Sequence, residues 1–139
     1  MRGVPIVKKP FINKEQLEKI ASEYATPFYL YDEKGIRENA RKVMQAFAWN
    51  KGFKEYFAVK ATPNPRLLQI LREEGCGADC SSYTELLMAD AVGFKESEIM
   101  FSSNVTPAED FRLARKLNVT INLDDITHID FLEKVVDIL

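Results

Sequence analysis

The sequence has few of the residues from which metal centres, disulfides and nucleophilic triads are built. Its only histidine is His128. Its two cysteines, Cys76 and Cys80, would lie roughly 13 Å apart on one extended strand, whereas a disulfide needs Cα atoms within about 7 Å. The spacing is also not C-x-x-C. We therefore expect reduced thiols, no metal site and no Ser-His-Asp triad.

Long apolar runs, strong net charge and glycine-rich phosphate loops are also missing. No segment approaches the about 20 apolar residues that a membrane span needs, and the first residues lack the apolar core of a signal peptide. The net charge of -2 gives no reason to expect nucleic acid or an anionic membrane as a partner. A length of 139 residues suits one compact domain. We expect a cytoplasmic protein without nucleic-acid or membrane partners.

What the sequence does contain is an alternation of helical and strand patterns. Asn13 and Gln16 have capping-box spacing at the start of a helix, and residues 28–31 form a short aromatic strand pattern. Residues 1–31 are therefore predicted to be an N-terminal helix and strand, and residues 32–139 a second region. That region begins with a helix and continues with about four strand–helix units. The expected strands cover residues 56–59, 75–80, 99–101 and 119–123.

Short strands that alternate with helices predict an α/β fold with a parallel sheet. Two architectures fit this pattern: a doubly wound open sheet, and part of an eight-stranded barrel. Periodicity alone does not choose between them. In both architectures, functional groups gather at the carboxyl ends of the strands.

Lys60 is the most informative residue at these strand ends. It directly follows the apolar run Tyr-Phe-Ala-Val, so a buried position would make its charge costly and lower its pKa. A neutral amine attacks aldehydes, which makes covalent attachment of a carbonyl cofactor a natural role. The alternative is a lysine that extends its amine to solvent at the strand end.

Other polar residues follow the later strands. Asp79 could pair with the Lys60 amine, or it could cap the next helix. Ser82 stands in capping-box register with Glu85, which is a structural device. Asn104 could contact a cofactor or serve as a turn residue. The same two interpretations, a site carboxylate or a helix cap, apply to Asp124 and Asp125.

Taken together, these segments resemble the diaminopimelate, ornithine and arginine decarboxylase family, which has the alanine-racemase-like fold. Residues 56–61, Tyr-Phe-Ala-Val-Lys-Ala, are similar to the family's lysine motif Y-A-V-K-x-N. Residues 75–86 resemble its second-strand motif, G-x-G-x-D-x-x-S-x-x-E-L. Further similar segments are residues 26–32, 99–104 and 122–125. Five motifs in the same order make the resemblance specific.

The resemblance implies the first half of a (β/α)8 barrel that binds pyridoxal phosphate (PLP). Lys60 matches the lysine that forms a Schiff base with the cofactor. Asp79, Ser82 and Asn104 match cofactor-site positions, and Glu85 matches an acid after the second strand. The implied reaction is decarboxylation of a small amino acid, with diaminopimelate as the nearest substrate and a homodimer as the full-length assembly.

Several alternatives stay open beside this prediction. Tyr83 and Thr84 replace two glycines common in diaminopimelate decarboxylases, which leaves an ornithine-specific enzyme as an alternative. A non-catalytic PLP-binding or regulatory relative would keep the same lysine motif. An unrelated open-sheet binding module would use the strand-end residues only as helix caps. Because only four of the barrel's strand–helix units are expected here, we predict that these 139 residues alone are inactive.

Overall fold

A computed structural model of the protein describes residues 9–136. The chain divides after Asp32 into two compact units. The described residues of the first unit, 9–32, contain one helix, α1 (Lys14–Glu23). None of the helices in the described part of the chain is both long enough and apolar enough to cross a membrane.

The capping box predicted at the start of α1 is confirmed. Asn13 Oδ1 accepts from the Gln16 backbone N–H at 2.8 Å, and Gln16 Oε1 accepts from the Asn13 N–H at 2.9 Å. The strand predicted over residues 28–31 is wrong, because this segment has no regular structure. A strand needs a neighbouring strand to hydrogen-bond with, and the described residues of this unit supply none.

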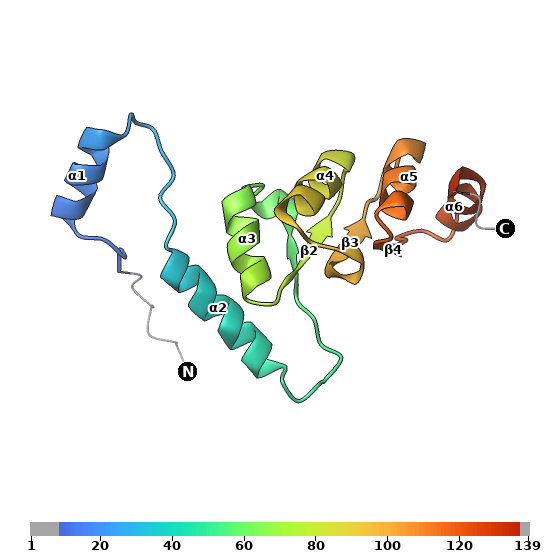
Figure 1. The fold of residues 1–139 in the computed structure, drawn as a ribbon, viewed down its shortest axis with the longest axis horizontal. Coiled ribbons are helices and arrows are strands. Elements are labelled where there is room, and N and C mark those ends of the chain that lie inside the picture. The colour runs from blue at the N-terminus through green and yellow to red at the C-terminus, as the bar shows by residue number, and fades with distance from the viewer. Residues whose placement is uncertain (1–8, 137–139) are drawn as a thin grey trace, which may run out of the picture. The chain divides into compact units, whose positions relative to one another are not determined.

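The second unit is an alternation of helices and short strands (Figure 1). It opens with α2 (Glu33–Ala46), and two short 3-10 turns, η1 (Val59–Ala61) and η2 (Glu96–Glu98), interrupt the alternation. The strands are β1 (Tyr56–Ala58), β2 (Gly77–Cys80), β3 (Ile99–Ser102) and β4 (Thr120–Asn122). The remaining helices are α3 (Pro65–Glu73), α4 (Tyr83–Val92), α5 (Ala108–Lys116) and α6 (His128–Val136).

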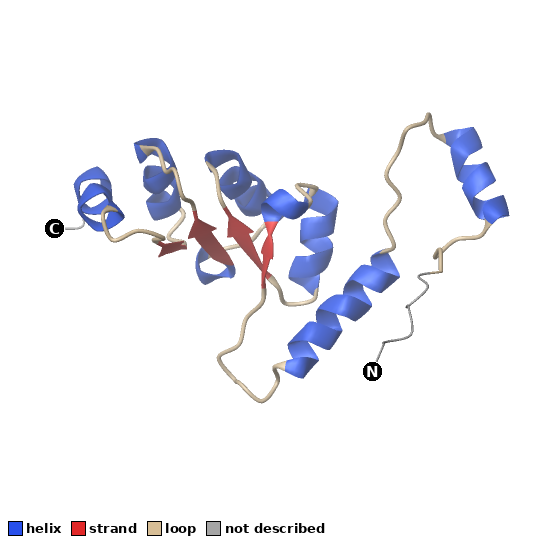
Figure 2. Ribbon diagram, turned by 180° about the vertical axis from the view of Figure 1, so that it is seen from behind, coloured by secondary structure: helices blue, strands red, loops and turns tan. Residues whose placement is uncertain are grey.

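Sheet topology decides between the two architectures that the pattern allowed. The strand order is β1-β2-β3-β4 and every pair is parallel. A doubly wound sheet reverses its strand order at a switch point and carries helices on both faces. Here the strands follow one another without reversal and the helices that connect them cover one face (Figures 1 and 2). The prediction of a barrel-type α/β fold with four strand–helix units is confirmed.

The main core lies between the sheet and its helices. Ala78 and Cys80 of β2 are fully buried, and Ile99 and Phe101 of β3 are each 1% exposed. Leu68, Leu86 and Phe111, with other apolar residues of α3, α4 and α5, pack against them. Because successive strand residues point to opposite faces, the alternate row points away from the helices. That row forms the inner face of the sheet, and no other helix or strand of residues 33–136 packs on it.

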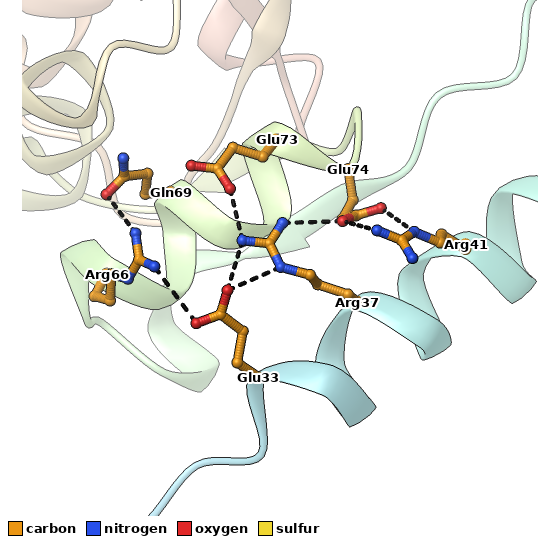
Figure 3. A network of polar contacts seen from close by, with 7 residues as sticks. All are labelled: Glu33, Arg37, Arg41, Arg66, Gln69, Glu73 and Glu74. Atoms are coloured by element: carbon orange, nitrogen blue, oxygen red, sulfur yellow. Dashed lines mark hydrogen bonds and ion pairs between the residues drawn. The ribbon is translucent and has the colours of Figure 1, made fainter.

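A polar network joins α2 to α3 (Figure 3). The Arg37 guanidinium donates to Glu33 at 2.7 Å, to Glu73 at 2.6 Å and to Glu74 at 2.9 Å. Arg41 donates to the other oxygen of Glu74 at 2.6 Å. The hydrogen bond from Arg41, followed by that from Arg37, lowers the pKa of Glu74. This network fixes α3, the helix that follows Lys60 in the chain.

Candidate active site at the carboxyl ends of the strands

Lys60 lies two residues beyond the end of β1, in η1, and not on the strand itself. Its side chain is exposed, whereas the neighbouring Val59 is fully buried in the core. Of the two interpretations of Lys60, the exposed amine is the one observed and the buried position is not. Apolar side chains alternate along a strand, but the turn after Ala58 directs Val59 to the core and leaves the Lys60 amine in solvent.

The backbone around Lys60 is held on both sides. The Thr62 N–H donates to the Val59 carbonyl at 3.1 Å, which closes the η1 turn. Asn64 then caps α3, with its Oδ1 accepting from the Arg66 N–H at 2.9 Å. The Lys60 amine itself makes no hydrogen bond or ion pair with any residue between 9 and 136. An ordered backbone with a free amine is the arrangement that a covalent attachment point requires.

Asp79 lies on the inner face of β2, in register with Ala58 of β1. The η1 turn that carries Lys60 contacts β2. Asp79 is half-buried, and its Oδ1 atom is buried without a hydrogen-bond partner among the described residues. Asp79 does not cap the next helix, because Ser82 occupies that position. A buried carboxylate oxygen normally accepts a hydrogen bond. The described residues supply no donor for this one, so it can accept from a bound group.

Ser82 is the N-cap of α4, and its Oγ accepts from the Glu85 N–H at 3.4 Å. The expected capping box is only half formed. The Glu85 carboxylate accepts from the Ser81 N–H at 2.7 Å, one residue before the position that a capping box uses. The two side chains thus hold the turn between β2 and α4 from within.

Asp110 also holds this turn, and the sequence analysis missed it. It lies in the first turn of α5 with 6% exposure, and its Oδ2 accepts from the Tyr83 N–H at 3.1 Å. Burial raises the pKa of Asp110, and the bond from Tyr83 opposes that shift. In the sequence, Asp110 looks like an ordinary acidic residue near a helix N-terminus. Its hydrogen-bond partner belongs to another strand–helix unit, and no local sequence pattern indicates that contact.

The remaining predicted strand-end residues are more peripheral. Asn104 is exposed after β3 and makes no hydrogen bond within the described part of the chain. Asp125 Oδ1 accepts from the Thr127 hydroxyl at 2.6 Å and from its N–H at 2.8 Å, and these bonds lower the pKa of Asp125. Asp125 therefore shapes the turn before α6, but its side chain bonds to Thr127 and to no N–H within the helix, so the predicted N-cap is not observed. The structure leaves Lys60 and Asp79 as groups without partners on neighbouring elements.

An inner-face pair was also missed. Asn122 Nδ2 of β4 donates to Ser102 Oγ of β3 at 3.3 Å. These residues are paired in register, as are Asp79 and Met100. Polar groups therefore continue along the inner face from β2 to β4. Alternation along a strand shows that neighbouring residues face opposite sides of the sheet. Which residues face the inner side is known only once the strand register is known.

Comparison with known proteins identifies relatives of this chain. The family model described as pyridoxal-dependent decarboxylase, pyridoxal binding domain, matches residues 33–137. Protein TabA of Pseudomonas amygdali pv. tabaci is 41% identical over 109 residues, which are 78% of this chain and 26% of that protein. Diaminopimelate decarboxylase of Methanothermobacter thermautotrophicus is 36% identical over 107 residues, 76% of this chain and 25% of that protein. The chain spans about a quarter of the length of these relatives.

Solved structures agree with this match. Diaminopimelate decarboxylase of Helicobacter pylori, in complex with L-lysine, superposes with a TM-score of 0.73 and 30% identity over 86% of this chain and 30% of that one. Lysine decarboxylase of Selenomonas ruminantium gives a TM-score of 0.83 over 94% of this chain and 35% of that one. Its identity of 24% supports the fold alone.

Proposed function

This chain belongs to the pyridoxal-dependent decarboxylase family, and we propose that it holds pyridoxal phosphate through Lys60 in an enzyme that decarboxylates an amino acid. The single observation that carries the proposal is the free Lys60 amine on η1, a turn that contacts β2, where Asp79 has a buried oxygen without a partner among the described residues. Pyridoxal phosphate is the cofactor of this family, and both groups fit it. The amine suits its aldehyde, and the carboxylate suits a protonated nitrogen nearby.

Each residue has a distinct part in this proposal. Lys60 would hold the cofactor through its amine, since amines condense with aldehydes with loss of one water. Asp79 Oδ1 accepts a hydrogen bond from a protonated nitrogen at this position and so holds that proton close to Lys60. Ser82 and Asn104 are proposed to contact the cofactor from the ends of β2 and β3. The bound cofactor supplies an electron sink for the electron pair that departing carbon dioxide leaves behind.

The proposed substrate is diaminopimelate, or a similar amino acid with a second charged group. Diaminopimelate decarboxylases from several organisms are among the relatives of this chain. An ornithine decarboxylase of Entamoeba histolytica also superposes on it, with a TM-score of 0.73, so ornithine is the competing substrate. We also propose that the complete enzyme is a homodimer, and that the present 139 residues alone release no carbon dioxide. Within residues 33–136, no other helix or strand packs on the inner face of the sheet, and open sites do not exclude water.

The test is borohydride reduction of the full chain in the presence of PLP, followed by peptide mass spectrometry. Borohydride delivers hydride to the carbon–nitrogen bond and makes the link permanent. We expect one pyridoxyl adduct, on Lys60, that is lost in Lys60→Arg, because arginine keeps the charge but does not condense with aldehydes. Lys116→Ala is the matched control, because Lys116 is an exposed α5 lysine without a partner in the described structure.

The outcome separates the alternatives. Adducts scattered over many lysines, or none at all, would contradict the proposal and favour an unrelated binding module. A Lys60 adduct without carbon dioxide release from diaminopimelate or ornithine, measured on the complete enzyme, would favour a non-catalytic PLP-binding relative. Release from ornithine alone would correct the substrate and leave the role of Lys60 intact.

A further inference from the structure

We propose that Asp110 is a positioning residue for the cofactor site, which it serves by fixing the turn between β2 and α4. The inference rests on the proposed function, because that turn directly follows Asp79 and Cys80 at the strand end next to Lys60. Asp110 does not belong to the same strand–helix unit. It reaches the turn from the first turn of α5, where its carboxylate accepts from the Tyr83 N–H at 3.1 Å.

Three backbone N–H groups at this turn bond to side chains of the chain itself. Glu85 accepts from Ser81 at 2.7 Å, Ser82 accepts from Glu85 at 3.4 Å, and Asp110 accepts from Tyr83. Two carboxylates therefore hold two residues of the turn, Glu85 of α4 holding Ser81 and Asp110 of α5 holding Tyr83. Because these bonds come from two different helices, the turn acts as a rigid support.

The Asp110 contact is more costly than helix formation requires. The first N–H groups of a helix can bond to water, and the Tyr83 side chain is 42% exposed, so solvent is near. A carboxylate with 6% exposure is instead kept in the interior, where burial opposes its charge. An apolar side chain would fill that position at lower cost. The carboxylate therefore fixes geometry, in that it ties the carboxyl end of β2 to the unit that follows β3.

The geometry matters to Lys60 because of the strand register. Asp79 pairs with Ala58, which lies two residues before Lys60, and Ser81 lies two residues after Asp79. A turn that loosens at Tyr83 releases the end of β2 that carries the Asp79 carboxylate. The amine and the carboxylate would then no longer be held in one arrangement, and a site misplaced by about 1 Å loses much of its effect.

Two pairs of variants test the contact in the full chain. Asp110→Ala removes the acceptor, whereas Asp110→Asn keeps an oxygen that can accept from Tyr83. Tyr83→Pro removes the donor together with the phenol. Proline is tolerated at the first helical position, and the extended Ser82 (φ -156°, ψ 164°) is compatible with a following proline. Tyr83→Ala is its matched control, since alanine removes the exposed phenol and keeps the N–H.

We measure the apparent Kd for PLP from the yield of borohydride-trapped Lys60 at increasing PLP concentration. We expect about a tenfold weaker Kd for Asp110→Ala and Tyr83→Pro, the scale of one hydrogen bond to a charged group. Asp110→Asn and Tyr83→Ala should stay within about twofold of the parent. In the absence of PLP, amide hydrogen exchange at Tyr83 should accelerate in Asp110→Ala and return towards the parent rate in Asp110→Asn.

Each result has a defined meaning. Equal trapping in the parent, Asp110→Ala and Tyr83→Pro would overturn the positioning role while leaving the proposed function standing. An equal loss in Tyr83→Ala and Tyr83→Pro would assign the effect to the phenol and also overturn it. If Asp110→Ala does not fold, the two Tyr83 variants decide the question. No trapping in the parent chain would refute the proposed function itself, and the inference with it.

Discussion

The two faces of the parallel sheet differ in composition and in solvent exposure. On the helix side, Ala78, Cys80 and Phe101 are at most 1% exposed and meet apolar side chains of the covering helices. On the inner side, the residues in the alternate positions are partly buried or exposed, except for the buried Gly77. They include the Asp79 carboxylate, which has an oxygen without a partner among the described residues. The helix side holds the apolar core that stabilises the fold, and the inner side carries the Asp79 carboxylate of the proposed site. Substitutions on the two faces should therefore separate stability from cofactor attachment.

The largest effect should come from the helix side. Phe101→Ala removes a fully buried ring that packs edge-on against Phe111 at 6.1 Å between centroids. We expect the free energy of unfolding to fall by about 3–5 kcal/mol, measured by urea denaturation. Met100→Ala, one residue earlier on the inner face, is the matched control and should cost clearly less. Equal losses from the two variants would mean that the faces do not differ as described.

The next effect should come from the one crowded position on the inner face. A Cβ added at Gly77 would lie 2.5 Å from the Tyr56 ring and 2.7 Å from the Glu98 carbonyl oxygen. Gly77→Ala should therefore destabilise the fold by about 1–3 kcal/mol through overpacking. Gly52→Ala is the control, because its nearest contact would be an ordinary 3.6 Å to Asn50. A Gly77→Ala protein with the parent melting temperature would rule out this close approach.

A smaller, pH-dependent effect is expected away from both faces, in the α2–α3 network. Because Arg41 and Arg37 lower the pKa of Glu74, its carboxylate stabilises the fold above the ordinary glutamate pKa. That contribution is lost as the pH falls through the lowered value. Glu74→Gln should thus lower the melting temperature at neutral pH, and the difference from the parent should shrink from about pH 5 downwards. Glu38→Gln, which breaks an exposed 3.9 Å pair with Lys34, should change little at either pH.

The smallest effect on stability should come from Asp79. Asp79→Asn keeps the volume of the side chain and removes a charge that has no partner on one oxygen, so the free energy of unfolding should change by less than about 0.5 kcal/mol. Trapping of PLP on Lys60 should nevertheless weaken, because the acceptor for the nearby proton is lost. The free energy of unfolding, from urea denaturation, and the yield of trapped Lys60 are measured on the same preparations of the parent and of Asp79→Asn. A large loss of stability with unchanged trapping would reverse the roles given to the two faces.

Local sequence patterns determined much of this protein. The Asn13–Gln16 capping box and the four strand–helix units follow from short-range spacing, because helices and strands bury side chains with fixed periods. The order of five short motifs also identified the family, since these segments are contiguous in the chain. The location of Lys60 directly after an apolar run was enough to mark it as the candidate attachment point.

Tertiary structure decided what depends on contacts between distant residues. The strand order and the single covered face, which separate a barrel-type sheet from a doubly wound one, arise from pairing between units and leave no local pattern. The exposure of Lys60 depends on a 3-10 turn that the apolar run did not indicate. Residues 28–31 form no strand, because the described residues of their unit offer no neighbouring strand. The bond from Tyr83 to Asp110 spans 27 residues. Only folding brings two such positions together, so only the folded chain reveals which carboxylates are engaged and which, like Asp79, are left free.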